Sequence, residues 1–245
     1  MKQGFYTILE NTPLAANVFR MRLGGDASAV TRPGQFVNLR LDGKFLRRPI
    51  SVCDWDGESI TIIYKILGDG TREMSRYPVG KKLDVLTGLG NGFDAAPAGD
   101  APLLVGGGVG TPPMVALARE LRTAGKTVTA VLGFNTAADV FCEKELSALG
   151  VKTVVATVDG SCGLRGFVTD AMAGLDYSYF FACGPEPMLR AVWRTAKTPG
   201  QLSFEERMGC GFGACMGCTC KTLTGYKRIC RDGPVLRKEE IAWDD

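Results

Sequence analysis

Four cysteines near the C-terminal end have the spacing of a metal–sulfur site. Cys210, Cys215 and Cys218 follow one another as Cys-x4-Cys-x2-Cys, and Cys230 lies twelve positions further on. This order is typical of a plant-type [2Fe–2S] cluster. The small residues between the cysteines allow backbone N–H groups to approach the cluster sulfurs. Zinc is the alternative, although zinc sites favour paired Cys-x2-Cys units and only one such pair is present.

The remaining cysteines are not assigned to this site. Cys220 follows Cys218 by two positions, and we predict a thiol that is not a ligand. Cys53, Cys142 and Cys162 receive no role. The total of nine cysteines is odd, and the N-terminus has no apolar leader segment, which argues against a secreted disulfide framework.

A glycine-rich segment could bind a pyrophosphate. It follows the apolar run Pro102-Leu103-Leu104-Val105 and precedes a helical pattern, so it lies at a strand-to-helix turn. The spacing departs from the usual dinucleotide fingerprint because the sixth position is Pro113. A tight turn without a ligand is the alternative. The predicted nucleotide-binding residues are Gly106, Gly107, Gly108, Gly110 and Thr111, with Thr111 as N-cap and Pro112 as the first helical residue.

A second loop is predicted to face the same nucleotide. Cys183, Gly184 and Pro185 follow the last apolar strand of this region. Because ligands bind beyond the carboxyl ends of parallel strands, we expect this loop beside the glycine-rich segment. A small buried cysteine is the alternative interpretation of Cys183.

A basic motif in the N-terminal part could bind a phosphate and a ring system. Arginine makes bidentate contacts with phosphate, and a serine hydroxyl can donate to the edge of a flavin. Two solvated arginines before a strand are the alternative. The residues concerned are Arg47, Arg48, Pro49, Ile50 and Ser51, followed by the strand residues Ile63, Tyr64 and Lys65 and by the turn residues Gly70 and Thr71.

Three segments position these residues. Residues 1–97 contain short alternating strands separated by Gly and Pro, which indicates an antiparallel β-barrel. Residues 98–199 alternate strands with helices, which predicts a parallel α/β sheet covered by helices. Residues 200–245 are too short and too rich in Gly and Cys to form a core without a metal. The expected fold class is therefore α/β plus β, with a small metal-binding module.

Composition removes several functions. The chain has 245 residues and no histidine, which excludes Ser-His-Asp and Cys-His catalysis and His-ligated metals. The net charge of +3 is too small to argue for nucleic-acid binding. The long uncharged stretch near residues 101–118 is interrupted by Gly and Pro, so no membrane span is expected. We therefore expect a cytoplasmic protein.

The order of these motifs resembles the ferredoxin–NADP reductase superfamily. Within it, the C-terminal cysteine module and the short chain resemble the family of electron-transfer subunits of NAD-dependent (type B) dihydroorotate dehydrogenases. The segments Leu46–Ser51 and Gly209–Cys215 carry the most specific part of the resemblance, which covers essentially the whole chain.

The resemblance implies three cofactors and one partner. FAD would bind in the barrel domain 1–97 at Arg48–Ser51, Ile63–Lys65 and Gly70–Thr71. NAD(H) would bind in domain 98–199 at the two loops, and Cys210, Cys215, Cys218 and Cys230 would hold the cluster in domain 200–245. An FMN-containing catalytic subunit, in a heterotetramer of two copies of each chain, would oxidise dihydroorotate in pyrimidine biosynthesis. This chain would supply no catalytic side chain.

Flavin suits the middle position because it exchanges both hydride and single electrons. We expect the partner to dock near the cluster, where Lys221, Lys227, Arg228 and Arg231 lie. The segment 133–139 contains no basic residue, which favours NAD(H) over NADP(H).

Other functions remain open. The same FAD and [2Fe–2S] module could serve a sulfide dehydrogenase, a bifurcating ferredoxin–NADP transhydrogenase or a hydrogenase. A free-standing diaphorase and a zinc-stabilised interaction protein are further alternatives.

Overall fold

The computed structural model describes residues 1–243 and contains a closed antiparallel barrel. The strand order around the barrel is β1-β2-β5-β4-β3-β6. The strands are β1 (Lys2–Ala15), β2 (Val18–Gly24), β3 (Phe36–Leu39), β4 (Arg48–Trp55), β5 (Ser59–Lys65) and β6 (Lys82–Leu89), and the short helix α1 (Asp69–Met74) follows β5. The predicted barrel is therefore confirmed, and closure leaves it without an edge strand.

Strand β5 shows why the barrel is joined to the rest of the chain. Ile62 and Tyr64 point into the barrel core, whereas Ile63 belongs to the apolar cluster that continues into the nucleotide-binding region. All three are almost completely buried. A barrel strand that is apolar on both faces must be covered from outside, and the covering layer is the α/β part of the chain.

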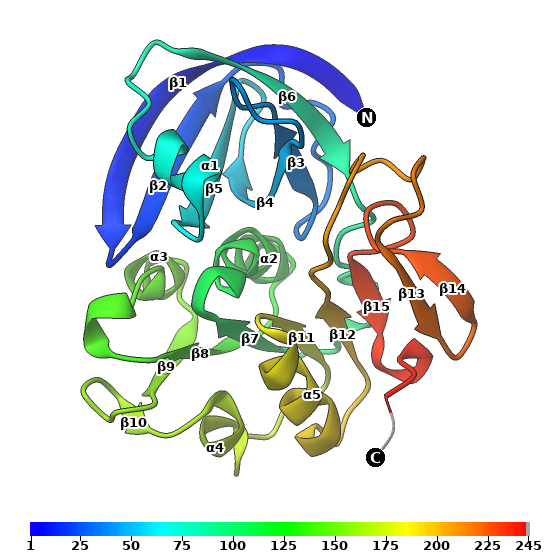
Figure 1. Cartoon of the computed structure of the whole chain (residues 1–245). Coiled ribbons are helices and arrows are strands. Elements are labelled where there is room, and N and C mark those ends of the chain that lie inside the picture. Colours follow the sequence, from blue (N-terminus) through cyan, green and yellow to red (C-terminus); the bar gives the residue numbers. More distant parts are fainter. Residues whose placement is uncertain (244–245) are drawn as a thin grey trace.

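A parallel sheet lies below the barrel (Figure 1). Its order is β10-β9-β8-β7-β11-β12-β15, and every neighbouring pair except β12 with β15 is parallel. The elements are β7 (Leu103–Gly107), α2 (Pro112–Thr123), β8 (Thr129–Phe134), α3 (Glu143–Ala148), β9 (Lys152–Thr157), β10 (Leu164–Arg165), α4 (Val168–Met172), β11 (Phe180–Cys183), α5 (Glu186–Thr195), β12 (Gly200–Ser203) and β15 (Val235–Arg237). The predicted alternation of strand and helix is confirmed.

The two faces of the sheet have separate cores. Helices α2 and α3 lie between the sheet and the barrel, and α4 and α5 cover the opposite face (Figure 1). Alternate residues of one strand serve the two faces, because Leu104 packs on the barrel side while Leu103 and Val105 pack on the other. The barrel-side layer is fixed to β4 by the ion pair of Arg119 with Asp54.

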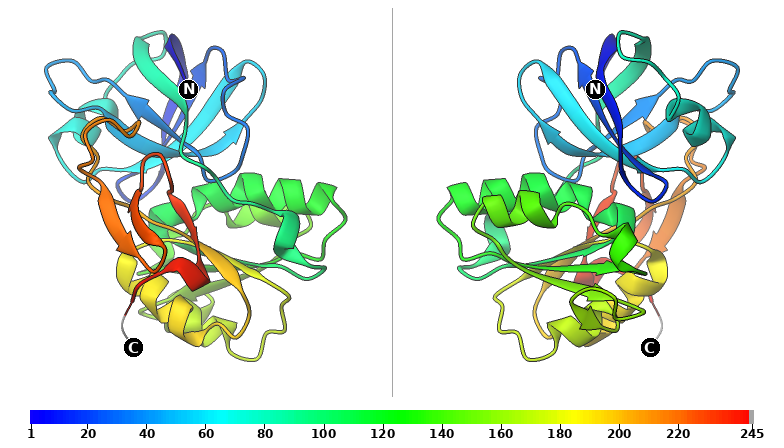
Figure 2. Two further views of the ribbon diagram at one scale, coloured as in Figure 1. Left: turned by 90° about the vertical axis from the view of Figure 1, so that its right-hand side faces the viewer. Right: turned by 90° about the vertical axis from the view of Figure 1, so that its left-hand side faces the viewer.

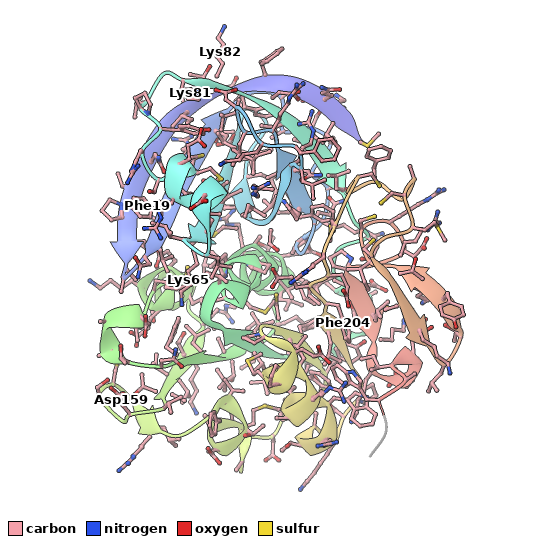
Figure 3. The ribbon with its side chains drawn as sticks, in the orientation of Figure 1. Phe19, Lys65, Lys81, Lys82, Asp159 and Phe204 are labelled. Atoms are coloured by element: carbon pink, nitrogen blue, oxygen red, sulfur yellow. The ribbon has the colours of Figure 1, made fainter. Side chains whose placement is uncertain are left out.

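The C-terminal module is attached to both larger parts. It contains the hairpin β13 (Thr219–Thr222) and β14 (Gly225–Arg228), and it packs beside the barrel and the sheet edge (Figure 2). Its strands β12 and β15 flank residues 204–234, and both belong to the seven-stranded sheet. Phe204, directly after β12, lies at this junction (Figure 3). Residues 200–243 are therefore joined to the barrel and to the sheet, and the domain boundaries at 97 and 199 stay a prediction.

Candidate functional site

The cysteine loop is ordered by backbone donors aimed at sulfur. Cys210 Sγ accepts hydrogen bonds from Ala214 N at 3.2 Å and Cys215 N at 3.4 Å, and Cys215 Sγ accepts one from Cys210 N at 3.4 Å. Burial raises the pKa of Cys210, but these donors outweigh it and bring the pKa down to about 6. The loop thus favours the thiolate that a metal requires.

The other two predicted ligands form a deeper pair. Cys218 and Cys230 are both buried, and Cys218 Sγ accepts a hydrogen bond from Cys230 N at 3.4 Å. Burial and the neighbouring Cys218 thiol raise the pKa of Cys230 to about 12. The four sulfurs therefore stand as two pairs, Cys210 with Cys215 and Cys218 with Cys230, which matches two protein ligands for each iron of a binuclear cluster.

Cys220 stands apart from these pairs. It lies on β13 opposite Lys227 and packs half-buried against the apolar cluster beside α5. Burial raises the pKa of its thiol. This placement agrees with a cysteine that is not a ligand.

The two predicted nucleotide loops lie against each other. Gly106 on β7 pairs with Cys183 on β11. A Cβ on Gly110 would overlap the Cys183 carbonyl and would lie 2.5 Å from Gly184 N, so only glycine permits this approach. The loops form one continuous backbone surface at the carboxyl ends of β7 and β11, where α/β sheets bind ligands.

Thr111 differs from the expected capping geometry. Helix α2 begins at Pro112 as predicted, but the Thr111 hydroxyl makes no capping hydrogen bond. Thr111 already has helical backbone angles, and its side chain turns toward Gly106 instead. Among the described residues, no group pairs with the buried Thr111 Oγ1. An unpaired buried hydroxyl in a nucleotide loop fits a polar ligand group.

The predicted flavin residues come together only in part. The Arg48 guanidinium packs on Gly70, because a Cβ there would lie 2.7 Å from Arg48 Nε. Thr71 Oγ1 orders the same turn by accepting hydrogen bonds from Leu67 N at 2.9 Å and Gly68 N at 3.3 Å. The structure therefore joins the strand β4 motif to the turn before α1, as one phosphate site would require.

Two other side chains of this region, those of Tyr64 and Arg47, already have hydrogen-bond partners within the protein. Tyr64 donates its hydroxyl hydrogen to Asn11 Oδ1 at 2.9 Å inside the barrel, and burial raises its pKa. Arg47 Nη2 donates to Asp84 Oδ2 at 2.7 Å, and Arg47 therefore serves the barrel rather than a ligand. Lys65 lies at the seam between barrel and sheet (Figure 3). Of these residues, Tyr64 can reach a cofactor only through its backbone.

Two hydrogen bonds between residues 1–97 and the C-terminal module were not predicted from the sequence. Asn38 Nδ2 donates to the Cys210 carbonyl at 3.2 Å, and Asn91 Nδ2 donates to the Val235 carbonyl at 2.8 Å. The available indication was an amide in the otherwise apolar strand Phe36–Leu39.

A cavity of about 650 Å³ lies elsewhere, between the loop 40–45 and β6, and its lining contains none of the predicted site residues. Among residues 1–243, no helix has the length and apolar character needed to cross a bilayer.

Two parts of the chain match described families. Residues 205–242 match the iron–sulfur cluster binding domain of dihydroorotate dehydrogenase B, and residues 104–194 match the oxidoreductase NAD-binding domain. The first range contains all four paired cysteines, and the second contains both nucleotide loops.

Similar solved structures share the architecture. A structure described as NADH-dependent reduced ferredoxin-NADP oxidoreductase, from work on flavin-based electron bifurcation, has a TM-score of 0.88 and 32% identity, and covers 98% of this chain and 90% of that chain. A flavohem-like FAD/NAD-binding domain of nitric oxide dioxygenase from Vibrio cholerae has a TM-score of 0.67 over 78% of this chain, at 21% identity, and covers 91% of its own length. The second likeness shows the barrel and sheet fold alone.

Curated relatives match over nearly their full length. The electron transfer subunit of dihydroorotate dehydrogenase B (NAD(+)) from Geobacillus sp. (strain WCH70) is 43% identical, with 98% of this chain and 99% of the relative covered. The subunit of the same name from Bacillus caldolyticus is 45% identical, with 96% of each chain covered. This similarity, together with the two sulfur pairs and the two nucleotide loops, shows that the chain belongs to the family of electron transfer subunits of NAD-dependent dihydroorotate dehydrogenase B.

Proposed function

We propose that this chain carries electrons between a catalytic partner and NAD+ through a [2Fe–2S] cluster and FAD. The observation that carries this proposal is the arrangement of four cysteine sulfurs in two pairs, in a module that touches both the barrel and the sheet. When bound, the cluster supplies single-electron transfer, and FAD links it to the two-electron chemistry of the nicotinamide. The net reaction would convert dihydroorotate and NAD+ into orotate, NADH and a proton.

The barrel residues would hold FAD. Arg48 and the Gly70–Thr71 turn, which pack together, would bind the diphosphate. The β4 residues Pro49, Ile50 and Ser51 would contact the flavin ring, and Ile63–Lys65 would line the same site with backbone groups. The barrel thus orients the cofactor and supplies no proton-transfer residue.

The α/β residues would hold NAD(H). The adjoining loops Gly106–Thr111 and Cys183–Pro185 present backbone N–H groups and the unpaired Thr111 hydroxyl. In the segment after β8, Asp139 Oδ2 accepts a hydrogen bond from Thr136 Oγ1 at 3.0 Å, and no basic side chain is present between 133 and 139. This composition supports NAD(H) rather than NADP(H), because a 2′-phosphate requires a basic partner.

The family name implies a catalytic partner subunit. We propose that this partner contains FMN, acts in the cytoplasm and forms a complex of two copies of each chain. Of the basic residues near the cluster, Lys227 pairs with Glu240 and Arg228 pairs with Asp232, whereas Lys221 and Arg231 are exposed. We therefore expect Lys221 and Arg231 to face the partner.

A second function has a specific observation in its favour. The structure with a TM-score of 0.88 and 32% identity is a ferredoxin-NADP oxidoreductase, so the same module could serve a bifurcating complex. The two functions differ in the partner and not in the cofactors of this chain.

The test is reconstitution. Anaerobically purified chain should contain one FAD and two irons per chain, with the visible absorption of both. Addition of the FMN-containing catalytic subunit should then give NAD+ reduction that depends on dihydroorotate. A colourless zinc protein would refute the electron-transfer function, and turnover only with ferredoxin and NADP(H) would favour the second function.

A further inference from the structure

Strand β3 contains one polar side chain in a fully buried position. Asn38 is 1% exposed, and its neighbours Val37 and Leu39 are completely buried. Burying an amide is unfavourable unless its groups find partners. Asn38 finds only some, because no described residue pairs with its Oδ1. Packing alone therefore does not explain an asparagine at this position.

The side chain of Asn38 meets the start of the cysteine loop. Its Nδ2 donates to the Cys210 carbonyl at 3.2 Å. The next residue, Gly211, is buried with a φ of +79°, and a Cβ there would overlap Asn38 Nδ2 and lie 3.2 Å from Asn38 Cγ. The loop backbone can therefore rest on Asn38 only because residue 211 is glycine.

The backbone of Asn38 meets the predicted flavin strand. Asn38 pairs with Pro49 on β4, directly beside Arg48. One residue thus contacts the first cysteine of the cluster loop through its side chain and the flavin-binding segment through its strand. The loop is also held from the far side, where Arg228 Nη1 donates to the Gly213 carbonyl at 3.0 Å.

We propose that Asn38 is the positioning residue that holds the Cys210 end of the cluster loop against the flavin-binding strand. It thereby sets the orientation of the Ala214 and Cys215 N–H groups toward Cys210 Sγ and the separation of the two electron-carrying sites. Donors to cysteine sulfur tune the potential of an iron–sulfur cluster, so the residue acts on electron transfer without touching sulfur itself. This inference rests on the proposed function.

The test compares Asn38→Leu with the intact holoprotein, since leucine has the same branched shape with four heavy atoms and removes the donor. We expect cluster iron to be lost to a chelator about fivefold faster, as the loss of one hydrogen bond predicts. We also expect a more negative cluster midpoint potential and slower cluster reduction after mixing with NADH. FAD content and NADH oxidation by a flavin-directed dye should not change.

A second variant, in the cysteine loop, disturbs the same contact between the loop backbone and Asn38. Gly211→Ala should reproduce these effects, and the double variant should do no more than either change alone, because both remove one contact. Gly225→Ala is the control for backbone strain in the same module, since Gly225 also has positive φ, at +115°, but a Cβ there would meet no atom within 4 Å. Thr87→Val controls for loss of a buried polar group elsewhere in the barrel.

The outcomes separate this inference from the proposed function. Unchanged cluster lifetime, potential and reduction rate in both variants would overturn it, as would additive effects or an equal effect in Gly225→Ala. If Asn38→Leu fails to fold, Gly211→Ala decides alone. A wild-type chain that lacks the cluster or FAD would instead refute the proposed function.

Discussion

The contact between the two nucleotide loops gives the sharpest prediction. A methyl group at Gly110 would lie 2.5 Å from Gly184 N, while ordinary contact begins at 3.4 Å. The Gly110→Ala variant must therefore move the loops apart by about 1 Å, and misplacement on that scale costs about 100-fold in rate. We expect kcat/KM for NADH in dye reduction to fall by about 100-fold.

The same variant should remain folded with its cofactors. Overpacking typically costs about 1–3 kcal/mol, so the melting temperature should fall by several degrees. FAD and iron content should match the wild type, because the atoms nearest to a Cβ at Gly110 belong to Cys183 and Gly184. Stopped-flow mixing with NADH, which follows flavin bleaching, separates slow hydride transfer from loss of cofactor.

Gly125→Ala is the control for backbone strain alone. Gly125, outside both loops, has a φ of +76°, but a Cβ there would meet no atom within 4 Å. This variant should lose stability and keep most of its NADH reactivity. Flavin bleaching at the wild-type rate in Gly110→Ala, or an equal loss in Gly125→Ala, would refute the argument that close approach of the loops forms the NADH site.

Three further predictions concern the cofactors and the barrel. Cys218→Ser should abolish the cluster while FAD binding survives, whereas Cys220→Ser should leave the cluster absorption unchanged; iron loss in the second variant would contradict the ligand assignment. Arg48→Ala should weaken FAD binding by about 10- to 100-fold in a fluorescence titration, and Arg47→Ala should lower the melting temperature instead. Despite burial, which raises it, hydrogen bonds from Arg47 and Gln3 hold the pKa of Asp84 below its ordinary value. The ionised Asp84 side chain therefore stabilises the fold above about pH 4, and this stabilisation is lost as the pH falls through the lowered pKa. Thermal melts of Asp84→Asn should therefore depend less on pH in acid than those of the wild type.

Much of the fold follows from local pattern. Alternating strands such as Asn17–Leu23 and the apolar run at 102–105 predict barrel and sheet, because strand periodicity is set by which faces are buried. The sequence reasoning makes no prediction for strand β6, although Leu83 and Val85 alternate with polar residues. Strands β12 and β15 were also missed, because each is short and pairs only with distant segments.

The candidate site was predictable where spacing alone carries the chemistry. The cysteine spacing identified a set that the fold arranges as two pairs, and the glycines marked a real close approach. Side-chain direction was not predictable: Tyr64 turns into the barrel, and Thr111 turns away from the helix terminus that it precedes. Asn38 could not be identified because its partner, Cys210, lies 172 positions away.

The pairing of β12 with β15 has a consequence for how the protein acquires iron. Ser203 and Val235 are opposite each other in the sheet, so residues 204–234 form a loop whose two ends are already joined. In an open chain, bringing the cysteines together would cost conformational entropy, because a loop would have to be closed. Here the pairing of β12 with β15 meets part of that cost, because it holds the two ends of the loop together. The cysteines are therefore gathered on a tethered loop rather than along an open chain.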